Sequence, residues 1–198
     1  MNGLAVLIIA GLLAGAAADV SQQQAAAFQK KLARIVAIGT ANAAAKKAPP
    51  PQQTIVTNDE LNSYLRFSAG EQLPVGVTEP SMVIQGGGRV SGRAVADLDI
   101  IRKKKGTGGW LDPTSYLTGR LPVTASGVLR TEDGRGRFEL SSAEVGGIPI
   151  PKSFLQEIVS FYTRTAEHPS GITIDQAFEL PAKIRRIDST PGRAVIVQ

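Results

Sequence analysis

Few side chains in this 198-residue sequence are of types that catalyse reactions, and they are scattered. His168 is the single histidine and follows a predicted helix, where interaction with the helix dipole is a more common role than general-base catalysis. Asp97 and Asp99 would share one face of a strand, but their neighbours make it the solvent face, unlike a glycosidase pair. The sequence also has no cysteine, so thiolate metal sites and cysteine nucleophiles are excluded. We therefore expect no enzymatic activity, no metal site and no cofactor.

Two glycine-rich stretches are weak candidates for phosphate binding. Residues 86–88 precede a predicted strand, whereas a phosphate loop opens a helix. Residues 105–109 lack the Gly-Lys-Ser/Thr order of a phosphate loop. We interpret both stretches as turns.

The basic run Arg102, Lys103, Lys104 and Lys105, with Trp110 nearby, is a candidate for contact with an anionic surface. From residue 56 onward, however, 17 basic side chains face 16 acidic ones, so the folded part is nearly neutral. Nucleic-acid binding needs a larger basic surface, so we expect no nucleic-acid partner. A loop that contacts lipid head groups, with Trp110 at the membrane interface, fits this composition. The alternative is an exposed loop at the end of a strand.

Alternation of apolar and polar residues predicts the strands that would position a binding site. Apolar residues occupy the even positions of 89–101 and the odd positions of 121–130, and Phe138 and Leu140 follow after a turn at 132–136. This pattern predicts an antiparallel meander with one apolar face. The residues at the middle of that face are small: Gly92, Ala94, Ala96, Ala125 and Gly127. They either leave a groove for an acyl chain or let a helix pack closely.

Two helices are predicted beside these strands. Pro149 and Pro151 prevent a continuing strand, and an apolar stripe follows at helical spacing: Phe154, Leu155, Ile158, Phe161 and Tyr162. Because such a stripe must be buried, we predict an α+β fold in which a curved antiparallel sheet wraps around this long helix at 151–166. A shorter helix at 58–68 precedes the sheet, and Thr57 and Glu60 form its capping box. Further strands are predicted at 171–174, 178–187 and 194–197.

The first 51 residues are predicted to lie outside the domain, which spans 52–198. Residues 1–18 carry no charge and end in three alanines, so they are either a cleaved signal peptide or a retained inner-membrane anchor. Both predict a periplasmic or other extracytoplasmic location, and cleavage would leave Asp19 as the first residue. Residues 19–51 are predicted to be an amphipathic, proline-terminated linker. Its helix either lies on anionic lipid or contacts the domain, and we favour contact with the domain.

The order of these elements resembles the small bacterial members of the tubular lipid-binding (TULIP) superfamily, relatives of the BPI and SMP domains. The resemblance covers 52–198 and is carried by Thr57-x-x-Glu60-Leu61, Gly147-Ile148-Pro149-Ile150-Pro151 and Pro191-Gly192-x-Ala194. It implies a sheet that wraps a long helix and leaves a groove for lipid chains. Small exported relatives are often lipoproteins, and the absence of cysteine departs from that pattern.

The resemblance implies non-enzymatic binding or transfer of lipid, or of another hydrophobic small molecule, in the cell envelope. The residues expected to line the groove are Ala94, Ala96, Leu98, Val123, Ala125, Gly127, Phe138, Phe154, Ile158, Phe161 and Tyr162. Membrane contact is expected at Arg102–Lys105 and Trp110. The alternative function is an envelope interaction module whose interior is filled and holds no ligand.

Overall fold

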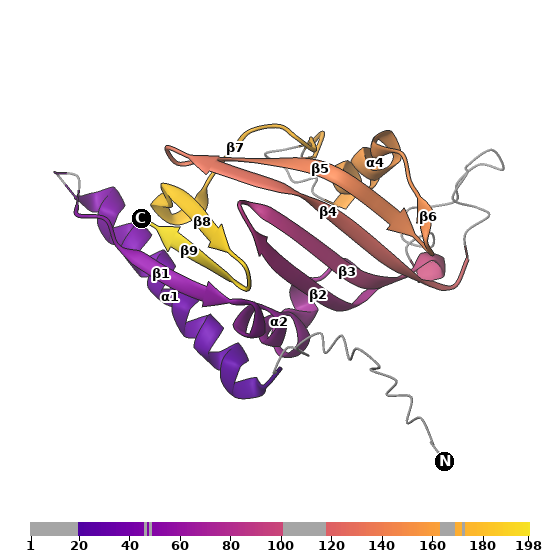
Figure 1. The fold of residues 1–198 in the computed structure, drawn as a ribbon, viewed down its shortest axis with the longest axis horizontal. Helices are drawn as coiled ribbons and strands as arrows, with labels where there is room; N and C mark the ends of the chain where they lie inside the picture. The colour runs from indigo at the N-terminus through magenta and orange to yellow at the C-terminus, as the bar shows by residue number, and fades with distance from the viewer. Residues whose placement is uncertain (1–19, 46, 48, 101–117, 163–168, 172) are drawn as a thin grey trace, which may run out of the picture.

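The chain forms an α+β fold with two antiparallel sheets (Figure 1). The structure is a computed structural model and describes residues 20–45, 47, 49–100, 118–162, 169–171 and 173–198. The smaller sheet has the strand order β1 (Gln53–Thr57), β9 (Arg193–Val197) and β8 (Arg186–Thr190). The larger sheet has the order β2 (Val77–Gly86), β3 (Arg89–Asp97), β4 (Arg120–Glu132), β5 (Arg135–Val145) and β6 (Ile148–Pro149), with β7 (Phe178–Glu179) also paired to β5.

The predicted antiparallel meander is confirmed by strands β3, β4 and β5, and β2 adds a further strand at its edge. Strands β3 and β4 pair over their common length, and β4 and β5 form a hairpin through Asp133 and Gly134. Both turn residues have positive φ, +46° and +79°, which matches the twist that a two-residue hairpin needs. Strand β3 ends at Asp97, and Leu98 lies in a helical turn rather than on the predicted strand. The expectation that Leu98 belongs to the strand face is therefore wrong.

The longest helix described is α1 (Gln22–Ala44), with 23 residues, and it packs into the domain. Its buried side contains Ala25, Phe28, Ile35 and Ile38, and the Phe28 ring lies 4.9 Å from that of Tyr64 in α2 (Asn58–Phe67). Ile35 also joins a core cluster with Leu180 and Ile184. Contact of α1 with the domain is thus confirmed. The predicted start of the domain at residue 52 therefore lies between α1 and the residues against which α1 packs.

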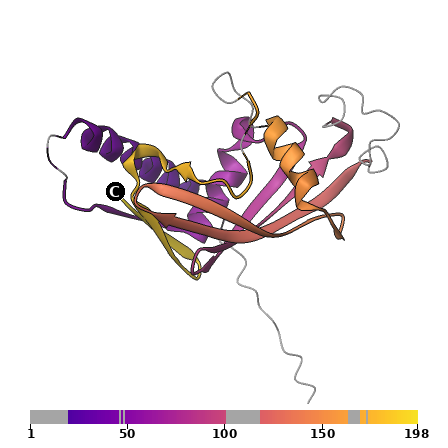
Figure 2. The ribbon, with the colours of Figure 1, turned by 90° about the horizontal axis from the view of Figure 1, so that it is seen from above.

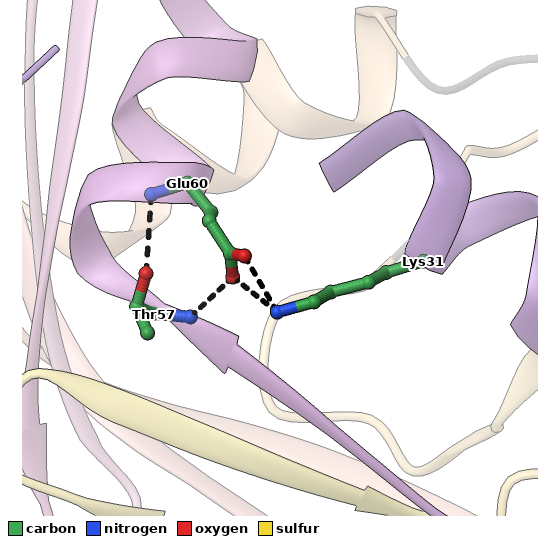
Figure 3. A network of polar contacts seen from close by, with 3 residues as sticks. All are labelled: Lys31, Thr57 and Glu60. Atoms are coloured by element: carbon green, nitrogen blue, oxygen red, sulfur yellow. Dashed lines mark hydrogen bonds and ion pairs between the residues drawn. The ribbon is translucent and has the colours of Figure 1, made fainter. Parts of the chain in front are cut away.

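An ion pair joins α1 to the start of α2 (Figure 3). The Nζ atom of Lys31 donates to both carboxylate oxygens of Glu60, at 2.5 and 2.7 Å. Glu60 also accepts from the backbone N–H of Thr57, and the Thr57 hydroxyl accepts from the backbone N–H of Glu60. The predicted capping box is therefore confirmed, and Lys31 is added to it.

A sheet wrapped around one long central helix is not confirmed. Helix α4 (Lys152–Tyr162) has 11 residues and lies beside β5, away from α1 (Figure 1). Figure 2 shows α1, α2 and α4 on the same side of the curved strands. Helical periodicity identifies the apolar side of a helix, but it does not identify the partner or the helix's place in the fold.

Two predicted C-terminal strands take other forms. Within the described part of 171–174 no strand is formed, and the Oδ1 atom of Asp175 accepts from the backbone N–H of Leu140 in β5. The predicted strand at 178–187 is divided by a 3₁₀ helix, η3 (Pro181–Lys183). Pro181 begins this turn because its ring fixes φ and removes a backbone donor.

Candidate hydrophobic-ligand face of the six-stranded sheet

Strand register gathers the predicted inward residues into rows on one face of the larger sheet. Opposite residues of paired strands share a face, so the pairs extend across β3, β4 and β5. The rows are Ala96 and Leu121; Ala94, Val123 and Val145; Gly92, Ala125 and Ala143; Gly127 and Leu140; and Leu129 and Phe138. We call these residues the apolar face. The opposite face carries alternating polar and charged residues, among them Arg93, Thr124, Ser126 and Ser142.

The helices cover the apolar face only in part. Ala96, Ala143 and Val145 are 5 to 6% exposed, so the chain buries them. Ala94, Val123 and Ala125 are half-buried and form an accessible centre. On the opposite face Val83 is 48% exposed, so solvent reaches that side.

Two glycines show where the apolar face has room and where it is full. A Cβ added at Gly92 would meet nothing closer than the backbone oxygen of Ser81, at 3.7 Å, which is an ordinary contact. A Cβ added at Gly127 would lie 2.4 Å from Cζ of Phe138 and 2.6 Å from the backbone oxygen of Glu139. The Phe138 ring therefore fills the space above Gly127. The space above Gly92, by contrast, is open.

Helix α4 is held beside this face by a short segment that borders β5. Lys152 forms an ion pair with Asp175, and the side-chain oxygen of Gln156 accepts from the backbone N–H of Ile174 at 2.6 Å. Asp175 also accepts from Leu140 of β5 at 3.2 Å. The segment around Ile174 and Asp175 thus ties α4 to the edge of the sheet.

Several predicted site residues have side chains that lie outside the part of the chain that the structure describes. The backbone of α4 places Phe154, Ile158, Phe161 and Tyr162 on a helix beside β5, but their side chains are not among the described parts of the chain. The predicted membrane-contact residues Arg102, Lys103, Lys104, Lys105 and Trp110 also fall outside the described residues.

One strand of this face, β2, was not predicted from the alternation of apolar and polar residues. Strand β2 contributes Val77, Met82 and Ile84, which lie opposite Ala96, Gly92 and Val90. A register shift between Thr78 and Ser81 interrupts the alternation in this strand, which hides it from a period-two pattern. The run from Met82 to Ile84, just before the glycines at 86–88, is the signal that could have revealed it.

One open hollow, of about 210 Å³, is lined by Gly92 and Ala125 together with residues of the opposite face, among them Val83, Thr124 and Ser126. Two larger hollows lie elsewhere and are lined by charged residues. One of about 750 Å³ borders Arg130, Glu132, Arg137 and Asp188 where the two sheets meet. Another, of about 410 Å³, borders Arg135, Glu179 and Lys183. The Arg130 side chain pairs with Glu139 at 3.0 Å, and Arg186 pairs with Asp188 at 2.9 Å. Arg130 and Asp188, which line the larger hollow, therefore already have charged partners within the chain.

Neither a metal-binding cluster nor a membrane-spanning helix is found among the described residues. Across this part of the chain, histidine and acidic side chains do not gather in threes where a metal ion could be held. No helix that the structure describes combines the length and apolar character needed to cross a membrane.

Comparison with known proteins gives no relative. No family model, no curated protein and no solved structure matches this chain. The resemblance to the tubular lipid-binding superfamily therefore stays a prediction.

Proposed function

We propose that this protein binds lipid or another hydrophobic small molecule on the apolar face of its larger sheet, without converting it chemically. The observation that carries this proposal is the row of small residues at the centre of the face. Gly92 and Ala125 lie opposite one another in register, Ala125 is half-buried, and a Cβ would fit above Gly92. A mainly apolar surface beside a covering helix is what a lipid site requires.

Extraction of the isolated protein with organic solvent tests the proposal directly. We expect a hydrophobic compound in the extract, in an amount comparable with that of the protein, identified by mass spectrometry. Protein denatured before purification and then refolded is the control, and it should yield none. An extract of the native protein that matches the control would contradict ligand binding.

A second function, an interaction module with a filled interior, is favoured by a different observation. The Phe138 ring fills the space over Gly127, and Ala96, Ala143 and Val145 are buried. This function predicts that the isolated protein carries no ligand and that it binds an envelope protein instead.

The proposed site of action is the periplasm or another compartment outside the cytoplasm. If residues 1–18 are a signal peptide, mass spectrometry of the mature protein should read Asp19 as its first residue. The N-cap of α1 would survive such cleavage, since Ser21 accepts from the backbone N–H of Gln24 and its own N–H donates to Ser63. Retention of Met1 in membrane fractions would indicate an anchor, and retention in a soluble cytoplasmic fraction would contradict export.

A further inference from the structure

Strand β1 forms an outer edge of the three-stranded sheet, and that edge is not paired with another strand. The inner side of β1 pairs with β9, and Gln52 and Gln198 exchange both backbone hydrogen bonds at the start of this ladder, at 3.0 and 2.9 Å. In an antiparallel ladder such bonded pairs recur at every second residue, so the even-numbered residues of β1 bond to β9. The backbone groups of Gln53 and Ile55 therefore point outward, away from the sheet.

These outward backbone groups have no partner among the described residues. At the end of β1 the outward N–H of Thr57 donates to Oε2 of Glu60 at 3.0 Å, which agrees with the alternation. No backbone or side-chain group in the described part of the chain bonds to the N–H or C=O of Gln53 or Ile55 on this side. Unpaired groups on an exposed edge are where a further strand can add. We call Gln53 and Ile55 the open edge.

The β2 edge of the larger sheet, by contrast, is closed by side chains of α2. The Asn62 amide accepts from the backbone N–H of Met82 and donates to the backbone oxygen of Met82, both at 2.8 Å. Oδ1 of Asn58 accepts from the backbone N–H of Ile84 at 2.9 Å. Helix α2 thus protects this edge against a further strand. No comparable side chain covers the open edge in the part of the chain that the structure describes.

The side chains along β1 also leave the open edge accessible. Ile55 is 47% exposed on the outer side of the sheet, where it lies opposite Val195 of β9. Residues 53–57 contain no charge and no proline, which are the features that commonly block edge strands. A partner strand bonded to Ile55 would place a side chain beside it on the same side of the sheet, and an apolar side chain fits that position.

Helix α1 places positive charge on the other side of this sheet. Lys31 reaches Glu60 at the end of β1, because α1 packs across the sheet alongside β1 (Figure 1). Arg34 is within one helical turn of Lys31 and of Lys30, so it lies on the side of α1 that Lys31 turns toward β1. Lys30 and Arg34 are exposed, and neither forms an ion pair with a described residue. Helix α1 contains no acidic residue.

The acidic side chains near β1 lie at its far end or are paired. Glu60 is paired with Lys31, and Asp59 lies beside it in the first turn of α2. On the outer side of the sheet, two strands away from β1, Asp188 pairs with Arg186 at 2.9 Å. The described charges that adjoin the open edge on the α1 side are therefore basic.

We propose that the open edge binds an extended segment of another protein as an additional strand, with an apolar side chain beside Ile55 and acidic side chains toward Arg34. Backbone hydrogen bonds supply the affinity, and the charge selects the partner. Two-fold pairing of two copies of β1 would instead bring both Arg34 side chains to the same side of the joined sheet, where like charges repel. Strand addition does not depend on ligand binding at the apolar face, which belongs to the other sheet.

Residue-resolved amide hydrogen exchange in the full chain tests the proposal. The probes are two eight-residue peptides, one that alternates glutamate and valine and one that alternates lysine and valine. Without peptide we expect fast exchange at Gln53 and Ile55 and slow exchange at Thr54 and Val56, which bond to β9. The glutamate peptide should slow exchange at Gln53 and Ile55 at least tenfold, and the lysine peptide should not. Unchanged exchange with the glutamate peptide, or equal slowing by both peptides, would overturn the proposal. Slowing that rises with protein concentration in the absence of peptide would indicate pairing of two copies and would overturn it as well.

Charge reversal provides the second arm. Arg34→Glu should weaken binding of the glutamate peptide at least fivefold and strengthen binding of the lysine peptide. Arg137→Glu makes the same change in net charge at an exposed arginine of β5 and should bind like the parent. Ile55→Pro removes one outward donor, and proline is tolerated on the solvent side of an edge strand, so this variant should also bind weakly. Fluorescence anisotropy of labelled peptide measures these affinities. Equal affinity of Arg34→Glu and Arg137→Glu for the glutamate peptide would overturn the proposal.

Discussion

Gly92 and Gly127 lie on the same face of the larger sheet but differ in what stands above their α-carbons. Gly92→Ala should be neutral or raise the free energy of unfolding by up to about 1 kcal/mol, because alanine loses less backbone entropy than glycine. Gly127→Ala should lower it by about 1 to 3 kcal/mol, because the new Cβ would overlap the Phe138 ring and the Glu139 backbone. Urea unfolding measures both values. Equal effects would show that the apolar face is uniformly filled or uniformly open.

The charge pair between Lys31 and Glu60 should make stability depend on acid pH. Burial alone would raise the pKa of Glu60, but the hydrogen bonds from Lys31 and from the Thr57 backbone, with the Lys31 charge, hold it below its ordinary value. A carboxylate with a lowered pKa stabilises the fold above its unfolded pKa of about 4.3, and this stability is lost as the pH falls through the lower folded-state pKa.

Lys31→Met should therefore lower the free energy of unfolding at pH 7 by about 1 to 2 kcal/mol. The free energy of unfolding of this variant should also decrease less than that of the parent between neutral and acid pH. Lys30→Met, at an exposed neighbouring position, should change it by less than about 0.5 kcal/mol. Urea unfolding at a series of pH values gives both slopes. Identical acid slopes for Lys31→Met and the parent would contradict the role of the pair.

At the residue scale, local contacts could be predicted and distant ones could not. The capping box joins two residues only three positions apart, so Thr57 and Glu60 suffice to predict it. Lys31 is 29 residues from Glu60, and nothing in the spacing identifies it as the partner. The Phe138 ring over Gly127 likewise depends on strand register, which alternation alone leaves open.

At the scale of elements, α1 depends on a close approach to η3. A Cβ at Gly39 would lie 2.4 Å from the backbone oxygen of Ala182. Gly39→Ala should therefore lower the free energy of unfolding by about 1 to 3 kcal/mol, although alanine favours the helix by about 1 kcal/mol. Thr40→Ala, at the exposed next position, should be nearly neutral. Stabilisation by Gly39→Ala would show that α1 does not pack against η3.

The small residues that allow this close approach explain why hydrophobic periodicity predicted α4, and not α1, as the central helix. Helix α4 has large apolar residues at helical spacing, which marks a buried stripe clearly. Helix α1 is rich in alanine and approaches its partners through Ala25 and Gly39, whose small size permits tight packing but gives little hydrophobic signal. Periodicity could predict α2 and strands β3, β4 and β5, because those signals are local.

At the scale of the whole molecule, local sequence patterns could not predict that the strands divide into two sheets. Strand β1 pairs with β9 from the other end of the chain, and β8 pairs with β9. The Thr131 hydroxyl links the sheets, because it donates to the backbone oxygen of Ile187 and accepts from its N–H. Alternation could predict one apolar face and most of its members, but the partition of strands is set by long-range pairing.

Ligand occupancy of two neighbouring variants tests the central claim most directly. Ala125→Leu adds bulk on the apolar face, whereas Thr124→Leu adds it on the opposite face of the same strand. Native mass spectrometry should show that Ala125→Leu weakens ligand binding about tenfold or more, since the added carbons take ligand space, while Thr124→Leu binds like the parent. The contradicting result is a parent protein without ligand and an Ala125→Leu variant that loses about 1 to 3 kcal/mol of stability, as overpacking of a filled interior requires.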